Sequence, residues 1–256
     1  MRRARIIPVL LIRKGGLYKS LRFKDHKYVG DPINAVRIFN EKEVDEIIIL
    51  DVDATIERRE PNLRKINEIA GEAFMPLAYG GGITGLEQVK QILYSGAEKI
   101  VFNHSAINQP KLIGETAKQF GSSSVVVSID VKKDWLGRYK VYGLNGSKNT
   151  RMDPLSMAKR MEAEGAGEIF LNAIDRDGTF QGFDTRLIAS VANEINIPVI
   201  ACGGAGKLED FKNVIKEGGA SAAAAGSYFV FQKPHRAVLI TYPSQEELKN
   251  EIYLQI

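Results

Sequence analysis

The chain has 256 residues and a mass of 28.3 kDa, which is enough to bury the core of one large α/β domain. Its 35 Lys and Arg residues outnumber its 31 Asp and Glu residues, but the basic residues are spread along the chain, which argues against a nucleic-acid partner. A single cysteine, Cys202, excludes an internal disulfide framework and a cysteine-rich metal site.

No apolar run approaches the ~18 residues that a membrane span requires. The three histidines, His26, His104 and His235, do not have the spacing of metal ligands. We therefore expect a cytoplasmic protein with no metal, no cofactor and no contact with a membrane.

Eight short apolar runs alternate with amphipathic segments along the chain. In order they read RIIPVLLI, EIIILDV, MPLAYGGG, KIVFN, VVVSIDV, EIFLNAI, IPVIACGG and SAAAAG. Parallel strands need a crossover between one strand and the next, so this alternation predicts a parallel sheet with helical connections. After the fifth run, residues 134–151 show alternating strand character and an Asn-Gly pair, which predicts a small hairpin.

The second half of the chain repeats the first. At a constant interval of 122 residues, Asp31-Pro32 recurs as Asp153-Pro154, and Gly81-Gly82 recurs as Gly203-Gly204. The opening strands align at an interval of 119 residues, where Leu11 stands opposite Asp130. Two halves of four β/α units each predict a single (β/α)₈ TIM barrel over residues 1–256, with half-barrels at about 1–122 and 123–256.

Two symmetry-related glycine pairs, at 81–82 and 203–204, each follow a strand and precede a helix. Backbone N–H groups that no side chain covers, next to a helix N-terminus, favour a phosphate group, although glycines can also serve tight turns alone. Two such loops predict a substrate with a phosphate at each end. The candidate phosphate-binding residues are Gly81, Gly82, Asn103, Ser105, Asp177, Gly178, Gly203, Gly204, Gly226 and Ser227.

Five aspartates lie at or just after predicted strand ends, where the active site of a TIM barrel forms: Asp51, Asp53, Asp130, Asp175 and Asp177. Each could act as a general acid or base, or could accept hydrogen bonds from loop N–H groups and cap helices. Asp130 ends an apolar run whose other residues belong in a core, so it is the strongest candidate for a site residue.

The motifs YGGGI, SIDVK, AIDRDGT and ACGGAGK, in this order, resemble those of the cyclase subunit of imidazole glycerol phosphate synthase, and the likeness extends over essentially the whole chain. The resemblance implies a barrel that joins a separate glutaminase subunit. Ammonia from that subunit would pass through the barrel to a bis-phosphorylated ribulosyl formimino substrate. The products in the family are imidazole glycerol phosphate and an aminoimidazole carboxamide ribonucleotide.

The family uses two aspartates, at the ends of the first and fifth strands, as its acid/base pair. The fifth-strand residue corresponds to Asp130, but the first-strand position holds Leu11. A leucine cannot exchange a proton, and the loss of one positioned acid or base typically costs about 10²–10⁴ in rate. Lys14 also stands where the family usually has an acid, whereas Lys19, in the first loop, is retained.

The opposite end of the predicted barrel keeps the charges of the family. Arg5, Glu46, Lys99 and Glu168, at strand starts, correspond to a ring that gates ammonia entry, and Glu98 corresponds to an acidic residue that contacts the glutaminase. Without the resemblance, these residues would be interpreted as solvated charges.

Three functions remain open. The first is a divergent paralogue that docks a glutaminase and channels ammonia toward amidation of a sugar in surface polysaccharide such as O-antigen, with a third, ATP-using protein activating the sugar. Leu11 beside an intact gate favours it. The second is a genuine cyclase (lyase) of histidine biosynthesis, in which Asp130 acts alone or with Asp51 or Asp177; the phosphate loops favour it. The third, a single-chain isomerase, explains the phosphate loops but not the charged ring.

Overall fold

The computed structural model describes residues 3–232, 235 and 237–256. Eight parallel strands form a closed barrel in which β12 pairs with β1 and β7 pairs with β10. The predicted (β/α)₈ barrel is confirmed. The barrel strands are β1 (Arg5–Arg13), β4 (Ile47–Asp51), β5 (Leu77–Gly80), β6 (Lys99–Phe102), β7 (Val125–Lys133), β10 (Glu168–Ala173), β11 (Val199–Cys202) and β12 (Ala222–Ala225).

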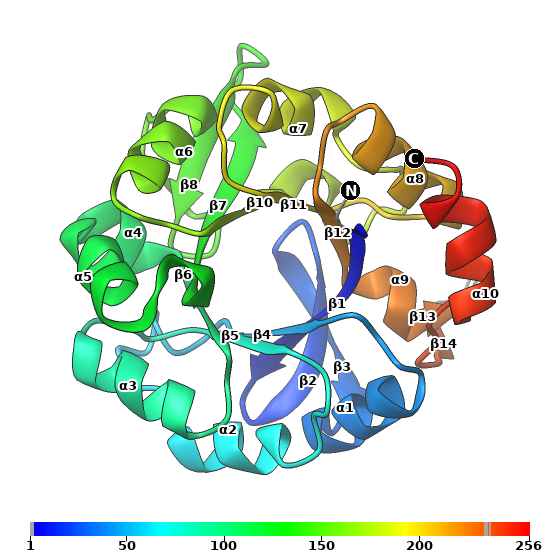
Figure 1. Ribbon diagram of the computed structural model, residues 1–256, viewed down its shortest axis with the longest axis horizontal. Helices are drawn as coiled ribbons and strands as arrows, with labels where there is room; N and C mark the ends of the chain where they lie inside the picture. The colour runs from blue at the N-terminus through cyan, green and yellow to red at the C-terminus, as the bar shows by residue number, and fades with distance from the viewer. Residues whose placement is uncertain (1–2, 233–234, 236) are drawn as a thin grey trace.

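Helices surround the strands as an outer ring, seen end-on in Figure 1. Their bounds are α1 (Pro32–Glu41), α2 (Leu63–Ala70), α3 (Leu86–Tyr94), α4 (His104–Asn108), α5 (Lys111–Phe120), α6 (Pro154–Ala163), α7 (Thr185–Ala192), α8 (Leu208–Lys216), α9 (Ser227–Val230) and α10 (Gln245–Leu248). Short 3₁₀ turns lie at Ser122–Ser124 and Ile174–Arg176, and a π-helical turn at Lys249–Tyr253 follows α10.

The sequence repeat has a structural counterpart in the helices. Helices α1 and α6 each have ten residues, begin with a proline at the first turn and are capped by an aspartate that accepts a hydrogen bond from the backbone N–H three residues later. These caps, Asp31 and Asp153, are the repeat partners found in the sequence. Helices α3 and α8 are likewise equal in length, with nine residues each.

Alternation along the strands divides the core into two layers. The side chains of one layer pack between strands and helices, and those of the other fill the inside of the barrel. The inner layer consists of Ile7, Val9, Ile48, Ala78, Val101, Val126, Phe170, Ile200, Cys202, Ala222 and Ala224, with Leu11 and Leu50 packed against it. The barrel interior is therefore apolar between its two polar ends.

Two hairpins extend from strand ends at the C-terminal face of the barrel. The strands β2 (Gly16–Leu21) and β3 (Lys24–Gly30) form the first, which lies across the middle of the ring in Figure 1. In the second region β8 (Tyr139–Gly143) pairs with both β7 and β9 (Lys148–Asn149), which confirms the hairpin predicted at residues 134–151. A small antiparallel pair, β13 (Phe231–Gln232) and β14 (Ala237–Val238), follows α9.

Candidate functional site

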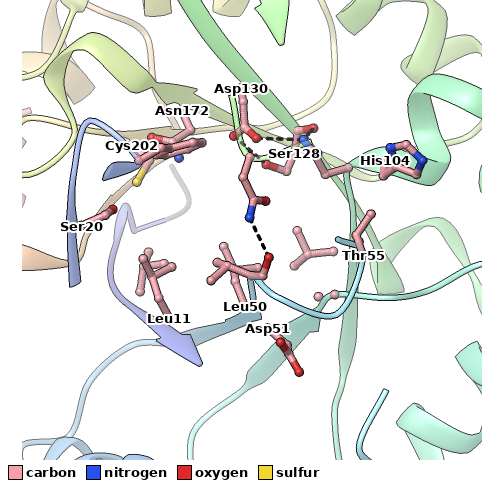
Figure 2. A pocket seen from close by; sticks show the side chains of 18 of the residues that line it. Leu11, Ser20, Leu50, Asp51, Thr55, His104, Ser128, Asp130, Asn172 and Cys202 are labelled. Atoms are coloured by element: carbon pink, nitrogen blue, oxygen red, sulfur yellow. Dashed lines mark hydrogen bonds between the residues drawn. The ribbon is translucent and has the colours of Figure 1, made fainter. Parts of the chain in front are cut away.

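The C-terminal mouth of the barrel encloses a cavity of about 120 Å³. Leu11 and Asp130 both line it, because each extends the inward-facing set of its strand. Figure 2 shows Asp130 with Ser128 and Asn172 on one side of the cavity and Leu11 with Leu50 on the other. The mouth therefore has one acidic side and one apolar side.

Asp130 is buried, with a fractional exposure of 7%. Burial raises its pKa to about 7, against the opposing effect of side-chain hydrogen bonds from Ser128, Asn172 and Asn103. The Asn103 amide donates to Oδ2 at 3.1 Å, and the Ser128 hydroxyl lies 3.5 Å from Oδ1. A carboxyl group with such a pKa can accept or release a proton near neutral pH.

The apolar side of the mouth is made by two adjacent leucines. Leu11 on β1 is the register partner of Leu50 on β4, and both project into the cavity. No proton donor or acceptor occupies the end of β1 at the place where the sequence resemblance implies an aspartate. Leu11 therefore lines the cavity with a side chain that cannot exchange a proton.

The two acids proposed as substitutes for the missing aspartate border the cavity, but both carboxylates are bound by other residues. The Asp51 carboxylate forms two 3.1 Å hydrogen bonds with Arg59 and accepts from the backbone N–H groups of Asp53 and Ala54. Along β4, Asp51 has the same orientation as Ile47 and Ile49, whose side chains face outward from the barrel. Its side chain points away from the centre of the cavity in Figure 2. Asp177 Oδ2 accepts from the Ser20 hydroxyl at 2.7 Å and from the Phe23 N–H at 3.2 Å.

The first hairpin is held across the mouth by these contacts with Asp177. Arg22 N–H adds a 3.0 Å bond to the carbonyl oxygen of Asp177. Lys19, expected in the first loop, lies on strand β2 within this β1-to-α1 connection. It is 97% shielded from solvent, and its Nζ donates to the carbonyl oxygen of Val9. Burial lowers the pKa of Lys19 to about 8.

The paired aspartates Asp53 and Asp175 have structural partners. Asp53 forms a 3.2 Å ion pair with Arg13, and Asp175 accepts a 2.8 Å hydrogen bond from the backbone N–H of Lys133. Both contacts hold loops at the C-terminal face. The structural interpretation of these two acids is therefore supported by their contacts.

The two glycine loops have equivalent geometry. Gly81 and Gly203 have φ of +128° and +94°. A Cβ at Gly81 would lie 2.4 Å from the carbonyl oxygen of Asp51, the last residue of β4, and a Cβ at Gly203 would lie 2.6 Å from that of Ala173, the last residue of β10. Glycine is required at both positions on steric grounds alone. Phosphate binding by these loops stays a prediction.

The other predicted phosphate-binding residues lie around the same mouth. Asn103, Ser105, Asp177 and Gly226 line the cavity, together with Gly81 and Gly82. Ser105 is buried and its hydroxyl donates to the carbonyl oxygen of Ile83, and Ser227 begins α9. Gly178, Gly203 and Gly204 belong to the neighbouring loops, and a Cβ at Gly226 would collide with the Lys19 amine.

Four charged side chains close the N-terminal end of the barrel in a ring. Arg5 pairs with Glu46 and, at 2.8 Å, with Glu168, while Lys99 contacts Glu46 at 3.0 Å and Glu168 at 3.3 Å. The ring therefore contains two cations and two anions, and each cation contacts both anions. Burial opposes the charge of Arg5, but the two glutamates outweigh it and raise the pKa of the guanidinium. The predicted proximity of these four residues is confirmed.

Two polar residues of the mouth, Ser128 and Asn172, were not predicted from the sequence. Both are buried, at 6% and 8% exposure, and both lie on inward-facing positions next to Asp130. Each is a polar residue within an apolar strand, at a position whose side chain alternation directs into the barrel. This pattern could have identified both residues from the sequence. Among the described residues no group of three His, Cys, Asp or Glu side chains could hold a metal ion.

Comparison with known proteins agrees with this architecture. Residues 5–235 match the family of histidine biosynthesis proteins. The chain belongs to this family. Within it, the chain is 51% identical over 248 residues to a Pseudomonas aeruginosa protein provisionally named imidazole glycerol phosphate synthase subunit hisF2, a match that covers 97% of this chain and 99% of the relative.

Two further members of the histidine biosynthesis family show the same full-length match. A Leptospira borgpetersenii protein, also provisionally named an imidazole glycerol phosphate synthase subunit, is 49% identical over 245 residues, covering 95% of this chain and 96% of the relative. The imidazole glycerol phosphate synthase subunit HisF of Alkaliphilus metalliredigens is 43% identical over 229 residues, covering 90% and 91%. The chain is thus a homologue of imidazole glycerol phosphate synthase subunits. None of the helices in its described part is long and apolar enough to cross a membrane.

Proposed function

We propose that the chain is the synthase subunit of a glutamine amidotransferase complex that conducts ammonia but does not perform the cyclase reaction of its family. The single observation that carries this proposal is the combination of Leu11 at the mouth with a complete ring of charges at the other end. The acceptor of the ammonia is, in this proposal, a sugar carboxyl group destined for surface polysaccharide such as O-antigen.

The loss of the first-strand acid argues against cyclisation. A reaction that uses two aspartates in turn as acid and base needs a proton carrier on both sides of the substrate. Leu11 and Leu50 supply none, and the Asp51 carboxylate is paired with Arg59. Of the two acid/base positions of the family, only the one at Asp130 holds an acid in this chain.

The ring and the apolar interior support a role in ammonia transfer. Each carboxylate of the ring, Glu46 and Glu168, contacts both Arg5 and Lys99, so movement of one cation leaves each acid with a partner. Beyond the ring the interior is lined by apolar side chains, among them Phe170 and the alanines of β12. An apolar lumen disfavours ammonium and favours neutral ammonia, the form that can attack a carboxyl derivative.

The N-terminal face has features of a docking surface for a glutaminase subunit. Phe74 and Tyr94 are 84% and 81% exposed, and both lie in segments that lead into barrel strands and hence at this face. Glu98 is exposed one residue before the gate residue Lys99. Exposed aromatic residues near a charged group are typical of protein interfaces.

Amidation of a carboxylate requires prior activation. Ammonia cannot displace an oxygen atom of an unactivated carboxylate, because that oxygen is too poor a leaving group. We therefore include a third, ATP-using protein that activates the sugar at the C-terminal face. The phosphate loops are, on this proposal, either inherited or used for an anionic group of the activated acceptor.

The second candidate is a genuine cyclase acting in histidine biosynthesis on a bis-phosphorylated substrate. The two equivalent glycine loops and the pKa of Asp130, about 7, favour it. It requires that one acid suffice for cyclisation.

Deletion of the gene in its own organism separates the two candidates. We expect the deletion strain to grow without histidine and to carry the free carboxylate in place of the sugar amide in its surface polysaccharide, and the wild-type gene to restore the amide. Loss of growth without histidine, with an unchanged polysaccharide, would establish the cyclase instead. A strain that keeps both traits would exclude both proposed roles.

A further inference from the structure

One polar atom of the mouth has no partner. The side-chain oxygen Oδ1 of Asn172 is buried and accepts no hydrogen bond from the described residues, although the residue is 8% exposed and lines the cavity. Asn172 is the register partner of Asp130 on the neighbouring strand, and its amide group lowers the pKa of that carboxyl group. No described residue donates a hydrogen bond to the oxygen Oδ1, so its lone pairs are unused.

Gly203 places no side chain against this oxygen. A Cβ at residue 203 would lie 3.2 Å from Asn172 Oδ1. Because Gly203 has none, this side of the oxygen is not covered by a side chain. Two acceptors, Asn172 Oδ1 and the Asp130 carboxylate, therefore lie next to each other at the end of the apolar barrel interior (Figure 2).

The charges at the mouth are also unbalanced. The Asp130 and Asp177 carboxylates line the cavity with the Lys19 ammonium, which lies near Asp177 and donates to a backbone carbonyl. Arg59, the partner of Asp51, is already used by that acid. When Asp130 is ionised, the two carboxylates of Asp130 and Asp177 face the single positive charge of Lys19, so the mouth has an excess of one negative charge. A ligand that carries one positive charge and several N–H donors would satisfy both the charge and the free oxygen.

We propose that Asn172 Oδ1 and the Asp130 carboxylate form a binding site for ammonium at the exit of the barrel. This inference rests on the proposed ammonia transfer and adds a holding site to it. Neutral ammonia that leaves the barrel interior takes a proton from the Asp130 carboxylic acid, and the resulting ammonium ion donates two of its N–H bonds to the two oxygens. When the acceptor arrives, one N–H proton passes to the Asp130 carboxylate, which becomes a neutral carboxylic acid, and the nitrogen lone pair is released for attack.

The leucine side of the mouth suits this role. Leu11 and Leu50 border the cavity opposite Asp130 and offer no acceptor that competes for the ion. A second aspartate in place of Leu11 would add another negative charge and hold ammonium more tightly. The apolar partner therefore favours release of the nitrogen toward the acceptor.

The test is ammonium binding by the full chain alone, with no glutaminase and no acceptor. Thermal unfolding is followed at about pH 8, above the pKa of Asp130 of about 7, in ammonium, potassium and tetramethylammonium chloride at equal ionic strength. A ligand that binds only the folded state raises the unfolding midpoint. We expect a rise with ammonium, of a size set by a dissociation constant on the order of millimolar, and a smaller one with the other salts.

Variants assign the effect to the two oxygens. Asn172→Leu should abolish the ammonium-specific rise, and Asp130→Asn should reduce it at least about tenfold in apparent affinity because the charge is lost. Ser128→Ala is the matched control: it removes a neighbour of Asp130 but leaves both acceptors, so the rise should persist. Line broadening of ¹⁵N-ammonium by the wild-type chain, relieved in Asn172→Leu, gives a second readout.

Equal stabilisation by potassium and ammonium would overturn the inference, because the site would then bind any cation of that size. Equal stabilisation of wild type and Asn172→Leu, or no broadening of the ammonium signal, would do the same. None of these results bears on ammonia transfer itself, which is measured separately with glutamine and the assembled complex. A failure of the holding site is thus distinguishable from a failure of the proposed function.

Discussion

Leu11 and Asp130 occupy equivalent positions in the two halves of the barrel and give its mouth two different sides. Both continue the inward set of their strand, so the difference is one of side-chain chemistry and not of placement. This pairing was readable from the sequence repeat. The full environment of Asp130 was not, because Asn103 follows β6 and Asn172 lies on β10, and only the folded barrel defines the register of these strands with β7.

Asp130 makes stability depend on pH in a predictable direction. Its pKa is about 7 in the folded chain and near the ordinary value of 3.8 when unfolded, so between these values the folded state binds a proton that the unfolded state has released. Stability therefore falls as pH rises through this window, by about 4 kcal/mol at most. Compared with Asp130→Asn, wild type should lose stability between about pH 4 and pH 7 in urea unfolding. A difference between the two that stays constant with pH would contradict this assignment.

The charged ring predicts a cost for removing one of its cations. Arg5→Ala leaves Glu46, which is 1% exposed, with Lys99 as its remaining ring cation. We expect the free energy of unfolding to fall by about 3 kcal/mol, as it does when a buried ion pair loses one partner. The exposed pair of Arg37 and Glu72 is the control, and Arg37→Ala should lower the free energy of unfolding much less, because solvent screens this pair. Equal losses in the two variants would show that the ring is merely solvated.

At the scale of elements, the barrel strands and main helices follow from the sequence because the repeat interval and the Asp-Pro caps are local signals. The first hairpin does not, although its strands carry the buried Lys19 and the turn at Arg22 and Phe23. Both turn residues have positive φ, 52° and 61°, without a glycine or Asn-Gly pair to mark them. The hairpin is held by long-range bonds to Asp177, which no local pattern encodes.

Asp177 should control the closure of this hairpin. Asp177→Ala removes the acceptor for the Ser20 hydroxyl and the Phe23 N–H, so hydrogen exchange should quicken over residues 16–30 while the barrel strands stay protected. Asp175→Ala is the matched control, because Asp175 accepts from the Lys133 N–H and its loss should affect the β7 end instead. Unchanged exchange over residues 16–30 in Asp177→Ala would mean that the hairpin packs without this acid.

At the scale of the whole molecule, the barrel separates two faces with different proposed partners. The N-terminal face carries the ring, Glu98 and two exposed aromatic residues, and the C-terminal face carries the cavity and the hairpins. The sequence repeat predicted this polarity because strand starts and strand ends could be read from it. The exposure of Phe74 and Tyr94 required the structure, since large aromatic residues are usually buried to a great extent.

Docking of the glutaminase should depend on the N-terminal face alone. Phe74→Ser should weaken the complex at least about tenfold, as loss of an exposed aromatic anchor does in other interfaces. Trp135, 89% exposed on the hairpin at the opposite face, provides the control, and Trp135→Ser should leave affinity unchanged. The affinities are measured by calorimetry with the purified glutaminase. A stronger effect of Trp135→Ser would place the partner on the wrong face for ammonia entry at the ring.

The central claim is that this barrel has lost cyclisation because Leu11 replaces an acid. Single-turnover conversion of the ribulosyl formimino substrate, with saturating ammonium in place of the glutaminase, tests it most directly. We expect no detectable imidazole glycerol phosphate from wild type and recovery in Leu11→Asp, by the factor of about 10²–10⁴ that a positioned acid or base contributes. Turnover by wild type at a rate that Leu11→Asp does not increase would contradict the account and identify the chain as a working cyclase.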